Sequence, residues 1–154
     1  MPLAVDSKVP DFTAAATGGD FTLSAQHGKT VVLYFYPKDN TPGCTTEGEN
    51  FSAANAKFQK ANAVVAGVSR DSVKSHEGFK AKMKFPFELI SDPDEKLCEL
   101  FGVMKMKNMY GRQVRGVERS TFVIDGAGKL RRQWRGVKVP NHVDQVLAFV
   151  QSLA

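Results

Sequence analysis

Cysteine is scarce in this chain, with only two among its 154 residues. Two thiols cannot form a disulfide framework, and alone they cannot supply the four ligands of a cysteine-rich zinc site. Scarce cysteine suits a reducing compartment, where a single thiol matters through its reactivity. The sequence also has no Cys-x-x-Cys pair, which argues against a dithiol–disulfide oxidoreductase. What each of the two cysteines does is therefore the main functional question.

Long apolar runs are also missing. No stretch approaches the roughly 18 uninterrupted apolar residues of a membrane helix. The N-terminal segment lacks the basic stretch and apolar run of a signal peptide. Internal repeats and low-complexity segments are absent, so we expect one domain over residues 1–154. These features predict a cytoplasmic protein with no membrane partner.

The formal net charge of +5 favours anionic partners in general. Basic residues gather at 105–115 and 131–138, but no nucleic-acid-binding motif accompanies them, and Tyr110 and Trp134 are too isolated to form a stacking platform. We therefore expect solvated basic surfaces and no nucleic-acid partner. A redox-sensing or binding module remains a non-enzymatic alternative. The three histidines are scattered, so no metal site is expected.

The pattern of apolar residues predicts alternating strands and helices. Continuous β-rich apolar runs indicate buried strands over 31–36, 63–68 and 87–90. Helical spacing and capping residues indicate helices over 44–61, from Asp71 or Ser72 to about 83, over 94–101, and from Asn141 onward.

Paired strands complete the expected fold. Residues 121–124 and 130–134 surround the turn signal 125–128 and predict a hairpin, and residues 10–28 predict a short N-terminal hairpin. Residues 104–115 are basic and are expected to form an irregular exposed loop. The simplest fit is a thioredoxin-like α/β fold, with a mixed central sheet flanked by helices and an N-terminal β-hairpin extension.

One segment carries the chemistry. Residues 37–47 join a predicted buried strand to a helix and place Cys44 in the first turn of that helix. The positive end of the helix dipole and the unsatisfied N–H groups there stabilise negative charge on the sulfur. Thr41 offers a hydroxyl that can both donate and accept hydrogen bonds. Pro37 and Pro42 stiffen the loop.

The spacing Pro-x-x-x-Thr-x-x-Cys, formed by Pro37, Thr41 and Cys44, resembles the active-site motif of the peroxiredoxins. The string Thr-Pro-Gly-Cys-Thr after an apolar strand end is similar to the bacterioferritin comigratory protein or peroxiredoxin Q subfamily. Further matches extend along nearly the whole chain, at residues 9–12, 67–72, 89–92 and 119–125.

The resemblance implies a thiol-dependent peroxidase that reduces hydrogen peroxide and organic hydroperoxides without a metal or organic cofactor. It implies that Cys44 is the peroxidatic nucleophile, oxidised to a sulfenic acid, and that Thr41 and Arg119 complete the catalytic group. Pro37 and the backbone amides of Gly43 and Cys44 would help to bind the peroxide. Glu47 matches a polar position beside the site, although an acid in the first helical turn explains it equally well.

The chain departs from the subfamily after Cys44. Many members carry a resolving cysteine five residues downstream, where this chain has Glu49, and others carry one near Phe79–Ala81, where this chain has none. We therefore expect a one-cysteine cycle with an external thiol, namely thioredoxin, glutaredoxin or a low-molecular-weight thiol. The subfamily also implies a monomer.

Cys98 is the remaining thiol. It shares a predicted helical face with Leu97 and Phe101, which favours a small buried core residue. The alternative is an atypical two-cysteine cycle in which Cys98 resolves Cys44 after a large rearrangement or between two chains.

Overall fold

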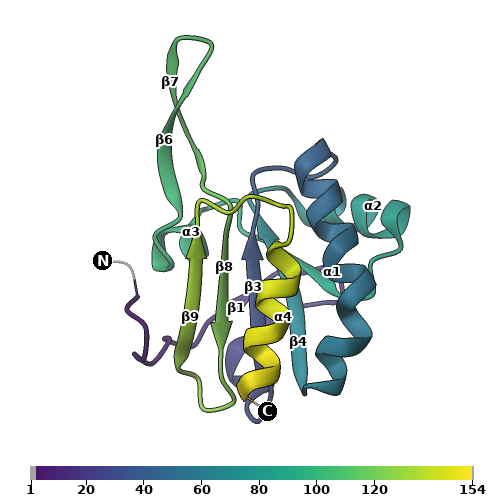
Figure 1. Ribbon diagram of the computed structural model, residues 1–154. Helices are drawn as coiled ribbons and strands as arrows, with labels where there is room; N and C mark the ends of the chain where they lie inside the picture. Colours follow the sequence, from purple (N-terminus) through teal and green to yellow (C-terminus); the bar gives the residue numbers. More distant parts are fainter. Residues whose placement is uncertain (1–2, 154) are drawn as a thin grey trace.

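The computed structural model describes residues 3–153 of the expected domain 1–154 (Figure 1). Its centre is a five-stranded sheet in the order β5-β4-β3-β8-β9. The first three of these strands in sequence are parallel, and the last two run antiparallel to their neighbours. The strands are β3 (Thr30–Phe35), β4 (Ala63–Ser69), β5 (Glu88–Ser91), β8 (Ser120–Ile124) and β9 (Leu130–Arg135). The mixed sheet and its late hairpin are confirmed.

Within residues 3–153, four α-helices connect or flank the strands, at the places that the sequence predicts. Their bounds are α1 (Pro42–Lys60), α2 (Val73–Met83), α3 (Lys96–Leu100) and α4 (His142–Leu153). Ser72 caps α2, because its hydroxyl accepts a hydrogen bond from the Ser75 N–H. Helix α3 is shorter than the expected 94–101. Among residues 3–153, no helix has the length and apolar character needed to cross a membrane.

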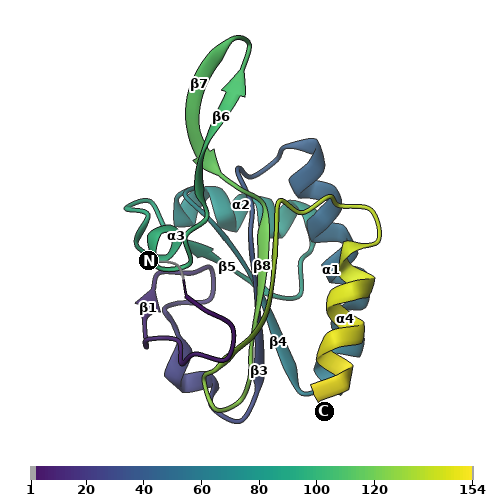
Figure 2. The same cartoon turned by 60° about the vertical axis from the view of Figure 1, so that its left-hand side comes forward.

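The sheet separates two apolar cores. Successive side chains of a strand point to opposite faces, so β3 contributes Val31, Leu33 and Phe35 to one core and Val32 and Tyr34 to the other. The core that contains Val32 also takes side chains from α1, α2 and α4. The core that contains Val31 is covered by α3 and the N-terminal segment. Figure 2 shows α1 and α4 on one side of the sheet and β1 and α3 on the other.

The expected N-terminal hairpin is present but very short. Strand β1 (Thr13–Ala14) pairs antiparallel with β2 (Phe21–Thr22), and the 3-10 helix η1 (Leu23–Gln26) follows. Gly19, between β1 and β2, has a φ of 101°, a left-handed conformation that glycine adopts without a steric penalty.

The prediction of an irregular loop over 104–115 is wrong. Strand β6 (Met104–Met109) pairs antiparallel with β7 (Arg112–Val117), and the two-stranded hairpin stands away from the rest of the molecule in both views (Figures 1 and 2). Both turn residues, Tyr110 and Gly111, have positive φ, as in the tight turns that match strand twist. The period-2 alternation of Met and Lys in β6 is a strand signal that the basic composition concealed.

Candidate active site

Cys44 lies in the first turn of α1, as the sequence predicts. Pro42 is the first helical residue, where its missing N–H removes no helical hydrogen bond, and Thr41 precedes it in extended conformation. The Thr41 hydroxyl does not cap the helix. It donates a hydrogen bond to the Lys38 carbonyl oxygen at 2.8 Å. The Cys44 side chain is buried, at 2% exposure, and its thiol is free.

Arg119 reaches Cys44 from a distant part of the chain. Strand register explains the meeting, because the last residue of β3, Phe35, pairs with the first residue of β8, Ser120. The end of β3 therefore lies beside Arg119, which immediately precedes β8. Arg119 Nη2 donates to Cys44 Sγ at 3.4 Å, and Nη1 donates to Glu47 Oε1 at 2.6 Å. One guanidinium group thus holds both the thiol and a carboxylate.

Glu47 is completely buried beneath this group. It lies beyond the first turn of α1, so the explanation of Glu47 as a first-turn acid is wrong. Burial raises the pKa of Glu47 to about 7, although the charge and hydrogen bond of Arg119 act in the opposite direction. Among the described residues, its second oxygen, Oε2, has no hydrogen-bond partner. Glu47 is therefore a buried acid that titrates near neutral pH.

The surroundings keep Arg119 charged and close to the sulfur. Burial alone would lower the pKa of Arg119, but the neighbouring Glu47 and Cys44 raise it. Gly43 leaves room for this approach, because a Cβ at position 43 would lie 3.2 Å from Arg119 Nη2. A fixed positive charge beside a thiol stabilises negative charge on the sulfur and on an oxygen leaving it.

The structure brings most of the predicted site residues together. Cys44, Arg119 and Glu47 are joined by hydrogen bonds, and Gly43 packs against the guanidinium. Pro37 and Thr41 lie in the loop between β3 and α1 that leads to Cys44.

Cys98 lies elsewhere. It belongs to the core covered by α3, whereas Cys44 belongs to the core covered by α1, so the two thiols lie on opposite faces of the sheet. Its side chain is fully buried, as the helical-face pattern predicts. Burial raises the pKa of the Cys98 thiol far above its ordinary value, and the nearby Asp92 adds to this effect. This environment disfavours the thiolate that nucleophilic attack requires.

Two further residues near the site carry no clear signal in the sequence. Asp39 lies in the active-site loop and contacts His76 of α2, with Oδ2 and Nδ1 2.7 Å apart. Both side chains are buried. His76 lies three residues before the core residue Phe79, a spacing that places both on one helical face and could have indicated burial.

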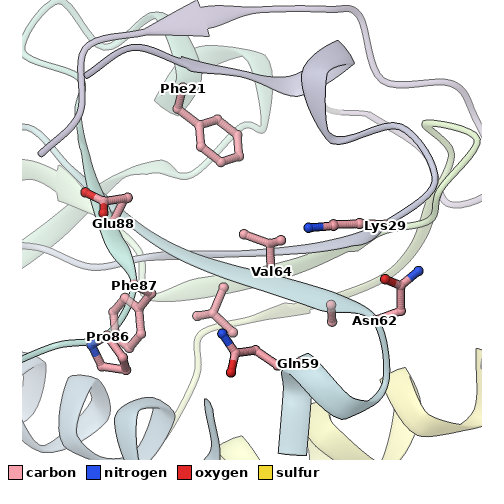
Figure 3. A pocket seen from close by; sticks show the side chains of 10 residues that line it. Phe21, Lys29, Gln59, Asn62, Val64, Pro86, Phe87 and Glu88 are labelled. Atoms are coloured by element: carbon pink, nitrogen blue, oxygen red, sulfur yellow. The ribbon is translucent and has the colours of Figure 1, made fainter. Parts of the chain in front are cut away.

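The structure has a surface hollow of about 340 Å³, and Figure 3 shows the side chains that line it. Its lining contains neither cysteine nor any residue of the segment 37–47. The hollow therefore does not belong to the Cys44 site. It is lined by Phe21, Lys29, Gln59, Asn62, Ala63, Val64, Val65, Pro86, Phe87 and Glu88.

Comparisons with known proteins agree with this geometry. The model of the AhpC/TSA family matches residues 5–133. Peroxiredoxin Bcp of Xanthomonas campestris is 54% identical over 145 residues, covering 94% of this chain and 91% of the relative. Peroxiredoxin Bcp of Bacillus subtilis is 43% identical over 155 residues, covering 100% of this chain and 99% of the relative.

A solved structure of the Xanthomonas campestris bacterioferritin comigratory protein superposes with a TM-score of 0.88 at 52% identity. The match covers 92% of this chain and 91% of that chain, and it confirms the expected thioredoxin-like fold. An alkyl peroxide reduction activity is ascribed to that Xanthomonas protein. Taken together, the matches show that this chain belongs to the AhpC/TSA family, among the thiol peroxidases of the peroxiredoxin Bcp and Q group.

Proposed function

We propose that Cys44 is the peroxidatic nucleophile and that the enzyme follows a one-cysteine cycle. The observation that carries this proposal is the contact of Arg119 with Cys44, made in the first turn of α1. A buried thiol at a helix N-terminus, hydrogen-bonded by a guanidinium group, has the two features that activate cysteine for nucleophilic attack.

In the oxidative step, the Cys44 thiolate attacks the terminal oxygen of the hydroperoxide. The S–O bond forms as the O–O bond breaks, the sulfur becomes a sulfenic acid, and the peroxide is reduced to water or an alcohol after the leaving oxygen takes a proton. Arg119 stabilises the charge that develops on the leaving oxygen. Because the Thr41 hydroxyl donates to Lys38, its oxygen lone pairs are free to accept the O–H of the peroxide.

The reductive step requires a second thiol, and the placement of Cys98 supports an external one. Cys98 is on the opposite face of the sheet from Cys44. Of the two usual locations of a resolving cysteine, one is occupied by Glu49, and the other, the stretch Phe79–Ala81, contains no cysteine. An external thiol attacks the sulfenic sulfur and releases water, and a further thiol then reduces the mixed disulfide. Peroxiredoxins use thiol reductants such as thioredoxin. Glutaredoxin and low-molecular-weight thiols remain candidates here.

The substrate proposal includes both hydrogen peroxide and organic hydroperoxides, because alkyl peroxide reduction is ascribed to the Xanthomonas relative. The proposed cycle needs no metal or organic cofactor. A single domain, a monomeric state, a cytoplasmic location and the lack of nucleic-acid or membrane partners remain predictions.

Intact-mass spectrometry after one equivalent of hydrogen peroxide tests this proposal, with a reagent present that traps sulfenic acid. We expect the wild type and Cys98→Ala to carry the trapped sulfenic acid and Cys44→Ser to carry none. Equal, slow oxidation of the wild type and Cys44→Ser would overturn the assignment of Cys44. Loss of two hydrogens from the wild-type monomer, abolished in Cys98→Ala, would overturn the one-cysteine cycle, and so would a disulfide-linked dimer.

A further inference from the structure

A buried polar network holds the active-site loop from behind. Asp39, in that loop, is 5% exposed, and its carboxylate has three side-chain partners. Oδ1 accepts from the Tyr36 hydroxyl at 2.6 Å, and Oδ2 accepts from the Ser75 hydroxyl at 2.8 Å and contacts His76 Nδ1 at 2.7 Å. Ser75 and His76 belong to α2, so this single side chain ties the loop to a helix far along the chain.

His76 faces a hydrogen-bond acceptor on each side of its ring. Nδ1 faces the Asp39 carboxylate, and Nε2 lies 2.9 Å from the carbonyl oxygen of Ile90 in β5. The ring therefore connects the active-site loop to β5 through both of its nitrogens. Loss of the ring would remove one buried partner from the Asp39 carboxylate and one from the Ile90 carbonyl, and buried polar groups that lose a partner are costly.

The network acts on one peptide group of the loop, the one between Lys38 and Asp39. Its N–H, which belongs to Asp39, donates to Asp71 Oδ2 at 3.0 Å. Its carbonyl, which belongs to Lys38, accepts the Thr41 hydroxyl at 2.8 Å. The N–H of this peptide group is therefore fixed by the Asp71 carboxylate. Its carbonyl oxygen in turn fixes the direction in which the Thr41 hydroxyl points.

The cluster is an internal network and not an ion site. Donor atoms of Asp39, Asp71 and His76 lie within 4.8 Å of one another, a spacing that a metal ion could bridge. Each of these atoms is already in hydrogen-bond contact with a protein group, including the Ser69 hydroxyl, which donates to Asp71 Oδ2 at 2.5 Å. The three side chains therefore satisfy one another and the backbone.

We propose that Asp39 and His76 are positioning residues of the peroxidase reaction. By fixing the peptide group between Lys38 and Asp39, they hold the Thr41 hydroxyl in the orientation that receives the hydroperoxide beside Cys44. This inference rests on the proposed function, because it assigns the pair a role in the step that Cys44 performs. Neither side chain contacts the sulfur. The pair therefore affects how the hydroperoxide is oriented and leaves the access of other reagents to the Cys44 thiol unchanged.

The test compares two reactions of the same thiol in His76→Gln and Asp39→Asn. Reaction with hydrogen peroxide needs the oriented Thr41 hydroxyl, whereas alkylation by iodoacetamide needs only an accessible thiolate. We expect the rate constant for hydrogen peroxide to fall about tenfold in both variants, since small misplacements of a positioning group cost one to two orders of magnitude. The alkylation rate constant should stay within about twofold of the wild type, because the environment of the sulfur is retained.

Two further variants separate positioning from stability. Ser72→Ala removes the cap of α2 without removing a contact of Asp39 or His76, so it should leave the peroxide rate constant unchanged. Thr41→Val removes the hydroxyl on which the pair acts, and adding His76→Gln to Thr41→Val should cause no further loss.

The proposal is wrong if folded His76→Gln and Asp39→Asn react with hydrogen peroxide as fast as Ser72→Ala. It is also wrong if the losses in rate constant add in the double variant of Thr41→Val and His76→Gln, or if neither single variant folds. Wild-type protein that consumes no peroxide would contradict the proposed function itself, which distinguishes the two failures.

Discussion

The two cysteines of this protein are both buried, yet their surroundings are opposite. Cys44 lies at the beginning of α1, with the Arg119 guanidinium group on its sulfur. Cys98 lies in an apolar core, with the Asp92 carboxylate as its charged neighbour and a thiol pKa raised by burial. The comparison shows that two buried thiols can have surroundings of opposite charge. The sign of the charge beside the sulfur separates the two sites.

Removing the positive charge from the Cys44 site should have the largest effect. We expect Arg119→Met to lower the second-order rate constant for hydrogen peroxide by about 10²- to 10³-fold, the usual cost of losing a group that stabilises developing charge. Competition kinetics against a peroxidase of known rate would measure it. Arg115→Met is the matched control, because Arg115 is half-exposed in β7 and pairs with Glu95. An equal loss in both variants would show that general charge, and not the contact with Cys44, sets the rate.

Glu47 makes the stability of the Cys44 side dependent on pH. The folded state holds the Glu47 proton up to a pKa of about 7, whereas the ordinary value is 4.5. Between these values the folded state binds more protons, so this contribution is fully present below about pH 4.5 and is lost as the pH rises to about 7. The shift corresponds to about 3 kcal/mol in the free energy of unfolding.

Urea unfolding of the wild type and Glu47→Gln at several pH values checks this expectation. The difference between the two free energies of unfolding should change between pH 4.5 and 7 and become constant above that range. The glutamine keeps an oxygen that can accept from Arg119 but cannot titrate. Parallel curves for the two proteins would contradict the raised pKa of Glu47.

The smallest effect is expected on the Cys98 side. Cys98→Ala removes one buried sulfur from a packed core and should lower the free energy of unfolding by about 1 kcal/mol, as for other small deletions in cores. Its peroxide rate constant should equal that of the wild type, because no group of the Cys44 site is altered. A large loss of peroxide turnover with multiple equivalents, at unchanged stability, would show that Cys98 takes part in the cycle.

Much of the architecture was predictable, because it follows from local patterns. The apolar run of β3 and the stop at Pro37 locate the loop before α1, although the helix begins at Pro42, two residues before the expected start at Cys44. The hairpin formed by β6 and β7 was missed because its strands are basic and exposed and do not join the central sheet. The only sequence signal of such a strand is the alternation of apolar and basic residues, and short basic loops can show the same alternation.

The contacts between side chains of the site were harder to predict from the sequence. The family resemblance indicates Arg119 and Glu47 separately, but not that one guanidinium group joins Glu47 to Cys44. The partnership of Asp39 with His76 left no sequence signal, since a histidine on an amphipathic helix is compatible with many partners.

The sequence by itself determined that Cys44 lies in the first turn of a helix after a buried strand, because helix starts, strand runs and proline stops depend on residues a few positions apart. It also determined that the usual positions for a resolving cysteine are occupied by other residues. Only the tertiary structure decided that Arg119 meets Cys44 and that Cys98 does not. The register of β3 against β8 brings Arg119 across 75 positions of the chain, and the alternation of side chains across the sheet puts the two thiols on opposite faces.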